Sequence, residues 1–398
     1  MLETLDAIAS AVTQADWILV NQQLQQLLDK KDATQADDNE LEQAVAIAMQ
    51  VMRVGDFQTR WDVAKIFPKI GEKSIVPLLE ILEDELADFE IRWFALRILG
   101  EFNQPEIIMS LVKLLEQTQE EDLAMMSAQI LAKIGKPAIT ALIELVKPDK
   151  SRLLAVKALA QIRHSEVIEP LLLVVNDSIP EVRFTAIEAL SSFHQKSLIP
   201  VFIKALKDPE AKVRKEAIIA LKMRAYLKQE FDLVNHLQPL LYDMNSEVCQ
   251  QAILALGCMK DDVAMMALFK ILNFHNTALF LKQEAIRALN WSGSLLALDY
   301  LKKGLESSDI TVSEEIIAVL GRPESAELNS YATSILINFL HSQREITHKS
   351  QIKLAIATSL GELGDLRALP YLEKLALDDD SRVKLYAKAA IKSVNSEQ

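Results

Sequence analysis

Two cysteines and six histidines are the side chains in this chain that most typically bind transition metals. Cys249 and Cys258 lie nine residues apart in one expected helix, where 100° per residue points them to opposite sides, so they cannot share a metal ion. An iron–sulfur cluster usually needs four thiolates. Cys258 alone stays open as one ligand or thiol contact at an interface, or as a small half-buried residue. The histidines are scattered and favour surface or capping roles: His164, His194, His236, His275, His341 and His348. We therefore expect no metal site.

Motifs of known catalytic and cofactor sites are absent from the chain. It has no G-x-x-x-x-G-K-S/T loop for phosphates, no H-E-x-x-H pair for zinc and no C-x-x-C pair. The acidic triplet Asp378 to Asp380 could attract a cation. Carboxylates are favoured at helix N-termini, however, and we expect Asp380 or Ser381 to cap the last helix. The sequence predicts neither catalytic residues nor a cofactor.

A short pattern recurs along the chain and predicts the elements that position these side chains. Its clearest copy is Val182-Arg183-x-x-Ala186-x-x-Ala189-Leu190-x-x-Phe193. The frames begin 28 to 40 residues apart, at Thr59, Ile91, Leu123, Ser151, Val182, Val213, Val248, Leu281, Val312, Ile352 and Val383. Such a period marks helix pairs that bury their apolar faces against their neighbours. We predict an all-α fold, an α-solenoid of about eleven helix pairs, in which helix B of each pair carries the pattern.

The expected organisation has three parts. Residues 1–40 form an N-terminal helical cap and an acidic loop, residues 41–322 carry most of the repeats, and residues 323–398 carry the C-terminal repeats after a longer connection. In the last frame, Lys388 stands where the other frames have aliphatic residues or alanine, as expected for a terminal repeat whose outer face meets water.

Composition limits the classes of fold and partner. Half of the residues are hydrophobic, and the 10 glycines and 12 prolines are too few for an all-β fold with many tight turns. Apolar runs are too short to cross a bilayer, and Glu3 and Asp6 stand where a secretory signal needs basic residues. We therefore expect a cytoplasmic protein with no membrane partner. The net charge of −13 disfavours nucleic acid as a partner.

The exposed side of the B helices is unusually apolar. At 100° per residue, positions 3, 4, 7 and 11 of each frame lie away from the core and should line the concave side of a solenoid. Large side chains fill these positions in two groups: Trp61, Trp93, Phe94, Met125, Met126, Leu153, Leu154 and Phe184, then Met223, Cys258 and Trp291. Lys65, Arg97 and Lys157 flank the first group at position 7. An apolar patch of this kind usually marks a binding surface, and we predict that a protein partner binds here. The open alternative is that residues 1–40 or tight curvature cover the stripe.

The Val-Arg-x-x-Ala-x-x-Ala-Leu frame, with Leu-Gly-x-Leu-Gly at 360–364, resembles the HEAT repeat. It looks most like the short HEAT-like repeat of phycobilisome lyase subunits, over about residues 41–398. In that family, arginines at position 2 join neighbouring repeats in a ladder. The matching residues are Arg60, Arg92, Arg152, Arg183 and Arg214, with Lys282, Lys353 and Lys384 as weaker equivalents, whereas Ala124, Cys249 and Ser313 depart from the pattern.

As a whole, the chain resembles cyanobacterial HEAT-repeat proteins that partner the iron–sulfur scaffold IscA. This resemblance implies a non-catalytic interaction scaffold that helps iron–sulfur cluster assembly by binding an IscA-type carrier in its groove. The alternative is a phycobilin lyase or bilin-handling chaperone, in which the groove holds a bilin for a phycobiliprotein and Arg97 or Lys65 pairs with its propionates. Lyase subunits of the family tend to be shorter than this chain, which favours the scaffold. A generic assembly factor for another complex is a third hypothesis.

Overall fold

The computed structural model describes residue 8 and residues 10–29, 38–323, 325–342 and 344–396. Their regular elements are all helical, and the chain divides into two compact units, residues 1–190 and residues 191–398. The boundaries expected at residues 40 and 322 both fall inside these units. Among the described residues, no helix has the length and apolar character that a membrane span requires.

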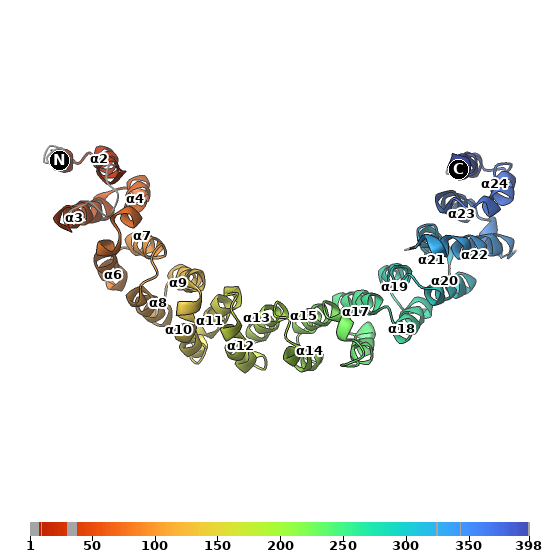
Figure 1. Ribbon diagram of the computed structural model, residues 1–398, viewed down its shortest axis with the longest axis horizontal. Coiled ribbons are helices and arrows are strands. Elements are labelled where there is room, and N and C mark those ends of the chain that lie inside the picture. The colour runs from red at the N-terminus through yellow and green to blue at the C-terminus, as the bar shows by residue number, and fades with distance from the viewer. Residues whose placement is uncertain (1–7, 9, 30–37, 324, 343, 397–398) are drawn as a thin grey trace. The chain divides into compact units, whose positions relative to one another are not determined.

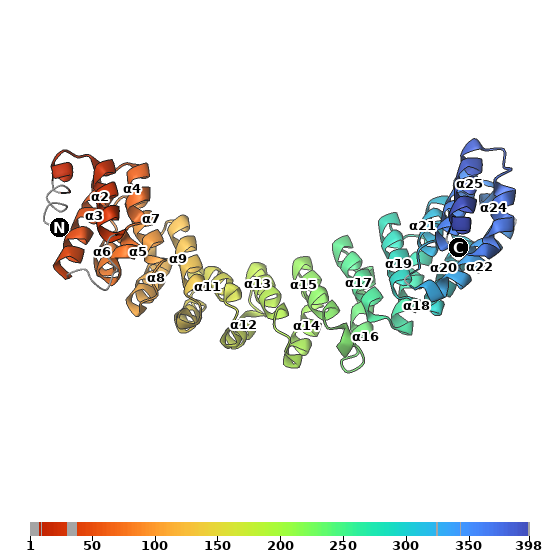
Figure 2. The same cartoon turned by 45° about the horizontal axis from the view of Figure 1, so that its top comes forward.

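Unit 1 consists of A and B helices in alternation. Figure 1 shows the A helices along one side of the unit and the B helices along the other, and the same two rows are visible in Figure 2. The A helices are α3 (Asp38–Val54), α6 (Ile75–Glu83), α8 (Pro105–Gln117), α10 (Ile139–Leu145) and α12 (Ile168–Val174). The B helices are α4 (Phe57–Ala64), α7 (Phe89–Leu99), α9 (Glu121–Ile134), α11 (Asp149–Gln161) and α13 (Pro180–Ser191), the last of which ends one residue inside unit 2. We call the side lined by these B helices the B face of unit 1.

Unit 2 repeats this arrangement (Figure 1). Its A helices are α14 (Ile199–Ala205), α16 (Leu233–Leu237), α18 (Asp262–Asn273), α20 (Leu295–Ser307), α22 (Asn329–His341) and α24 (Leu369–Leu375). Its B helices are α15 (Ala211–Lys222), α17 (Ser246–Met259), α19 (Leu279–Trp291), α21 (Ile310–Leu320), α23 (Ser350–Leu363) and α25 (Ser381–Ser396). Every predicted frame therefore begins in a B helix, which confirms the all-α repeat of helix pairs.

The core lies between successive pairs because the apolar positions of each frame face the next repeat. In α13, for example, Val182, Ala186, Ile187 and Leu190 are all completely buried. Consecutive B helices contact one another in both units. For example, α7 contacts α9 in unit 1, and α15 contacts α17 in unit 2. Burial is thus distributed along each unit and is not gathered in one central core.

The first pair departs from the regular pattern. Helix α4 ends at Ala64, and a short helix α5 (Phe67–Ile70) follows with Pro68 in its first turn. Proline has no N–H to continue the hydrogen-bond ladder, and its ring clashes with the carbonyl four residues before it, so the helix breaks at this point.

The N-terminal segment contains helix α2 (Trp17–Asp29), which contacts α3 and α4. Its Val20 and Leu24 are buried, and the Asn21 side-chain amide donates a hydrogen bond to the Thr59 carbonyl at 3.2 Å. Most of the expected acidic loop, residues 30–37, lies outside the described residues. Residues 38–40, which we expected in that loop, are the first residues of α3.

Candidate binding face

Four aromatic rings cluster on the B face of unit 1, where α4 contacts α7. Phe57 and Trp61 come from α4, and Trp93 and Phe94 come from α7. The Phe94 ring lies 5.3 Å from Phe57, 6.5 Å from Trp61 and 5.1 Å from Trp93, with interplanar angles of 57°, 79° and 89°. Steep tilts of this kind suit aromatic pairs because a ring's positive edge then meets its neighbour's negative face. The four side chains form one packed group, which we call the aromatic cluster.

The place of Phe94 corrects a sequence-based expectation. We expected it on the exposed stripe, but its side chain is 0% exposed. The cause is the packing just described, in which the three other rings cover it from α4 and from its own helix. Phe94 is therefore the buried member of the aromatic cluster and offers no surface to a partner.

Phe57 is a member of the cluster that the sequence analysis missed. It stands two residues before the first frame, so the pattern did not include it, yet its side chain is 52% exposed and stacks with Trp61 at 6.1 Å. The signal was its spacing of four residues from Trp61, because side chains at i and i+4 of a helix are neighbours.

Arg97 adds a positive charge to the aromatic cluster. Its guanidinium carbon lies 3.5 Å from the centroid of the Trp61 ring and 5.8 Å from that of Trp93. The side chain is half-buried, and no described carboxylate forms an ion pair with it. Lys65 differs, because its ammonium pairs with the Asp62 carboxylate at 2.9 Å. Of these two basic residues, only Arg97 has no described carboxylate to neutralise its charge.

The rest of the predicted stripe in unit 1 lies on α9, α11 and α13. Met125 is 48% exposed, and the other members, Met126, Leu153, Leu154 and Phe184, are half-buried. The third flanking cation, Lys157 on α11, is exposed and forms no ion pair with a described residue. Apolar side chains thus remain partly open along the B face of unit 1. That a partner binds them stays a prediction.

The later members of the stripe belong to unit 2. Met223 and Trp291 are exposed at the ends of α15 and α19, and Cys258 is exposed on α17. Cys249, on the same helix, is buried, and its thiol donates a hydrogen bond to the Asp243 carbonyl at 3.1 Å. Burial, the largest cause, and the nearby Asp243 carboxylate raise the pKa of the Cys249 thiol. The two cysteines therefore lie in different environments, as their spacing predicted.

The basic residues at position 2 act structurally where the structure describes their partners. Arg60 pairs with Glu90, Arg152 with Asp177 at 3.4 Å and Arg214 with Asp243 at 2.7 Å, each time in the next repeat. Lys353 pairs with Asp378 in the same way at 2.6 Å. Arg92 instead donates to the Leu82 carbonyl of its own repeat, and Lys282 and Lys384 form no ion pair with a described residue. The expected ladder is present in parts of the chain.

Asp380 of the acidic triplet and His164 prove to be capping groups. The Asp380 carboxylate accepts a hydrogen bond from the Arg382 amide at 2.8 Å, at the start of α25. His164 Nδ1 accepts one from the Glu166 amide at 3.3 Å. Within the described part of the chain, no group of three or more His, Cys, Asp and Glu side chains could hold a metal ion.

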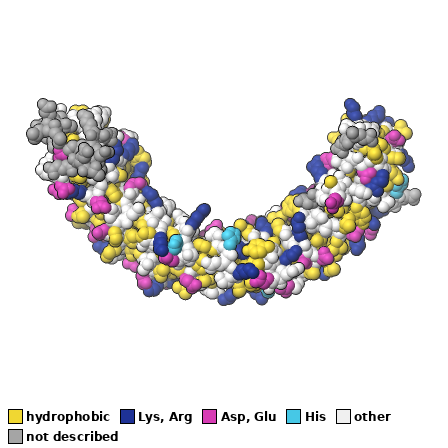
Figure 3. Space-filling view, in the orientation of Figure 1, with side chains coloured by type: hydrophobic (Ala, Val, Ile, Leu, Met, Phe, Trp, Pro, Cys, Tyr) yellow, Lys and Arg dark blue, Asp and Glu magenta, His cyan; other side chains and the backbone are white. Residues whose placement is uncertain are grey.

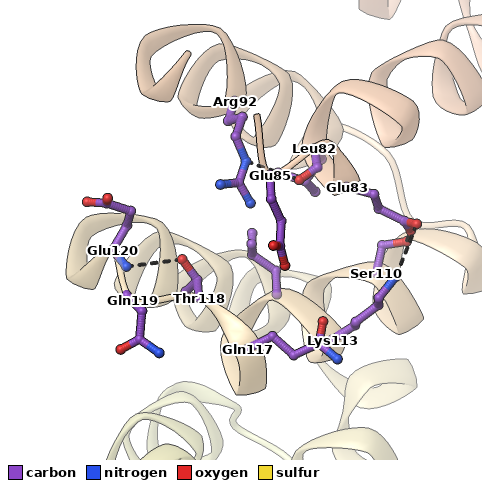
Figure 4. A pocket seen from close by; sticks show the side chains of 11 residues that line it. Leu82, Glu83, Glu85, Arg92, Ser110, Lys113, Gln117, Thr118, Gln119 and Glu120 are labelled. Carbon is purple, nitrogen blue, oxygen red and sulfur yellow. Dashed lines mark hydrogen bonds and ion pairs between the residues drawn. The ribbon is translucent and has the colours of Figure 1, made fainter. Parts of the chain in front are cut away.

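A pocket of about 420 Å³ lies among α6, α7, α8 and the loop before α9 (Figure 4). Arg92 enters it from α7 and Lys113 from α8. The Glu83 carboxylate accepts hydrogen bonds from Ser110 at 2.8 Å and Lys113 at 3.3 Å, and the Ser110 bond contributes most to holding the pKa of Glu83 below its usual value. The repeat pattern does not predict this pocket, because loops between repeats, which the pattern does not cover, help to line it. Glu83 pairs with Lys113, whereas Glu85, Arg92 and Glu120 form no ion pair with a described residue, so charges of both signs line the pocket.

The family of the chain follows from comparison with known proteins. A model of HEAT repeats matches residues 75–154, 147–222 and 234–321, which together make up more than half of the chain. The chain belongs to the HEAT-repeat family. A model of the phycobilisome (PBS) lyase HEAT-like repeat also matches residues 352–378. HEAT repeats favour protein partners, because stacked helix pairs offer an extended surface. No curated protein sequence matches this one.

A solved structure supports the repeat fold. A chain from the structure in which Kap95p binds RanGDP matches with a TM-score of 0.56 and 14% identity, over 91% of this HEAT-repeat chain and 55% of that one. An engineered protein matches with a TM-score of 0.36 and 21% identity, over 94% and 98% of the two chains. Human deoxyhypusine hydroxylase matches with a TM-score of 0.30 and 18% identity, over 81% and 96%. Only the first of these scores is high enough to support a shared fold.

Proposed function

We propose that this HEAT-repeat chain is a non-catalytic scaffold that binds a protein partner through the B face of unit 1. The observation that carries the proposal is the aromatic cluster, in which the exposed Phe57 ring packs with the half-buried Trp61 and Trp93 rings and Arg97 lies over Trp61. Tryptophan and arginine are the residues that most often dominate the free energy of protein–protein binding. Rings already packed against one another also lose little conformational freedom when a partner binds.

The distribution of charge supports a protein partner over nucleic acid. Figure 3 shows acidic and basic side chains interspersed with hydrophobic ones over the face in view, without a broad basic field. Nucleic-acid binding generally relies on such a field to neutralise phosphates. The net charge of −13 points the same way.

The candidate partner that we favour is an IscA-type iron–sulfur carrier. The support for it is the resemblance of the whole chain to HEAT-repeat proteins that partner IscA. In this proposal the carrier brings the cluster and its ligands, and the HEAT-repeat chain holds the carrier in place. The solved structure that supports the repeat fold is one in which Kap95p binds RanGDP, another protein.

The test measures the affinity of the full chain for an IscA-type carrier by isothermal titration calorimetry. Trp61→Ala and Met125→Ala remove exposed apolar area from the B face, and we expect Trp61→Ala to raise Kd at least about tenfold. Met109→Ala is the matched control for Met125→Ala, because Met109 is an exposed methionine on α8 in the other row of the same unit. Equal effects of the two methionine variants, with unchanged melting temperatures, would place the binding site elsewhere.

A bilin-handling function is the second candidate, favoured by two observations. The chain contains a match to the PBS lyase HEAT-like repeat, and Arg97 presents an unneutralised charge beside aromatic rings that could stack on a tetrapyrrole. Mixing the purified chain with a bilin and recording the visible spectrum tests it. A coloured adduct that transfers to an apo-phycobiliprotein would favour this candidate, and an unchanged bilin spectrum would remove it.

A further inference from the structure

Arg97 has no carboxylate partner among the described residues. On the neighbouring helix α4, Arg60 pairs with Glu90 and Lys65 with Asp62, and on α7 itself Arg92 donates a hydrogen bond to the Leu82 carbonyl. Arg97 forms neither an ion pair nor a hydrogen bond with any side chain that the structure describes. Its guanidinium lies over the Trp61 ring and 5.8 Å from the centroid of the Trp93 ring. The charge has no described counter-charge, and a binding partner can supply one.

The geometry leaves the donors of Arg97 available. A guanidinium stacked on a ring uses its flat face for the contact, while its N–H groups point outward in the plane of the group. That edge matches the two oxygens of a carboxylate, which it can bind through two parallel hydrogen bonds. The Trp61 ring, only 3.5 Å away, holds the guanidinium in a fixed position and so reduces the entropy lost on binding.

The surroundings specify what must lie next to that carboxylate. The half-exposed Phe57 ring, which stacks with Trp61, and the half-buried Trp93 ring belong to the same cluster as the guanidinium and offer apolar surface. Lys157, further along the B face, has no ion pair with a described residue and adds a second positive charge. The B face of unit 1 thus offers two positive charges without described counter-charges beside apolar side chains, although the chain as a whole is acidic.

We propose that Arg97 is a specificity-determining residue that binds an aspartate or glutamate of the protein partner, in a segment where an apolar side chain adjoins the acidic one. The inference rests on the proposed function and names the chemistry that the B face recognises. Trp61 positions the guanidinium, and Phe57 and Trp93 receive the apolar side chain. A partner covering the site removes water from the ion pair, which strengthens the attraction between the charges.

A selection experiment tests the inference without a known partner. A random dodecapeptide library displayed on phage is selected on the full wild-type chain and, in parallel, on Arg97→Gln and Arg163→Gln variants. Arg163 is the matched control, because it is an exposed arginine of the same unit with no described ion pair or ring contact. We expect the wild-type chain and Arg163→Gln to enrich peptides that contain Asp or Glu next to an apolar residue. The Arg97→Gln variant should lose the acidic preference.

The enriched peptide then allows a direct measurement of the coupling. Replacing its acidic residue by the corresponding amide should weaken binding to the wild-type chain at least about fivefold and leave binding to Arg97→Gln unchanged. If the amide peptide is weakened equally on both chains, Arg97 does not bind the carboxylate.

The outcomes separate this inference from the proposed function. Peptides that need Trp61 but show no acidic preference would overturn the carboxylate recognition and leave the scaffold intact. If the enriched peptides bind the Trp61→Ala and Arg97→Gln variants as tightly as they bind the wild-type chain, both proposals are overturned. If no peptide is enriched and a bilin binds in an Arg97-dependent way, the proposal that Arg97 binds a partner's carboxylate is overturned. That result would favour the lyase function.

Discussion

Arg224 shows at the residue scale how a buried charge can stabilise the repeat without a carboxylate. Its side chain is 1% exposed, and its guanidinium donates hydrogen bonds to the carbonyls of Ser191, Phe193 and Ala220 at 2.8, 2.6 and 2.6 Å. Burial lowers the pKa of Arg224, and its Nε has no described hydrogen-bond partner. The guanidinium thus ties the end of α13 and the link after it to α15. It is a structural residue, in contrast to the half-buried Arg97.

Replacing Arg224 by methionine tests this role. The substitution keeps most of the volume but leaves three carbonyl groups without these donors, so we expect the free energy of unfolding to fall by about 2 kcal/mol. Chemical denaturation of the full chain measures the change. Lys222→Met, at the end of α15 two residues before Arg224, is the control and should change stability by less than about 0.5 kcal/mol. If Arg224→Met leaves the free energy of unfolding unchanged, the cost of burying the charge cancels the stabilisation from its hydrogen bonds.

At the element scale, glycine determines how closely neighbouring B helices approach each other. Gly257 and Gly361 both stand at position 10 of their frames and face an alanine at position 8 of the next B helix, Ala288 and Ala390 respectively. A Cβ atom on Gly361 would lie 2.7 Å from the Ala390 Cβ and 2.8 Å from its Cα. These contacts are too short for any added atom, so α23 and α25 can pack closely only because the residue is glycine.

Gly361→Ala should therefore destabilise the chain. Alanine favours helix formation over glycine by about 1 kcal/mol, but overpacking against a backbone atom costs about 1–3 kcal/mol and should dominate. Urea denaturation measures the result. Gly100→Ala is the comparison, because its added Cβ would meet the Ile130 side chain at 3.0 Å, and a side chain can move aside. A stabilised Gly361→Ala variant would show that the two helices can separate without cost.

At the scale of the whole molecule, acidic side chains link the stability of the repeats to pH. The Asp243 carboxylate accepts hydrogen bonds from Arg214 Nε and Nη2 at 2.8 and 2.7 Å. Burial by itself would raise the pKa of Asp243, but the bonds from Arg214 and the Asn245 amide outweigh it and hold the pKa below the usual 3.8. The pKa of Asp378 is lowered as well, and the hydrogen bond from Lys353 is the main cause.

These shifts predict acid lability. A lowered folded-state pKa stabilises the fold above the unfolded-state pKa, and that stability is lost as the pH falls through the folded-state value. We expect the free energy of unfolding to decline as the pH is lowered from about 5 to 2, as followed by denaturation at each pH. Asp243→Asn should be less stable at pH 7 and decline less steeply. Asp379→Asn, at an exposed position with no described ion pair, should retain the wild-type slope.

The sequence by itself determined the repeat architecture. The positions of the B helices, the burial of residues such as Val182 and Leu190, and the capping by Asp380 were all predicted from spacing and residue type. The physical reason is that helical periodicity and capping depend on residues within a few positions of each other. When the same pattern recurs many times, each copy reinforces the same interpretation.

Only the tertiary structure decided the details of the candidate site. It buried Phe94, added Phe57, left Arg97 stacked on Trp61 without a carboxylate and opened a pocket beside Arg92. Each of these outcomes depends on side chains from neighbouring helices or loops, and therefore on how closely those elements approach and which rotamers remain allowed. A pattern read along one helix contains no information on that distance, because the residues that set it lie about thirty positions away.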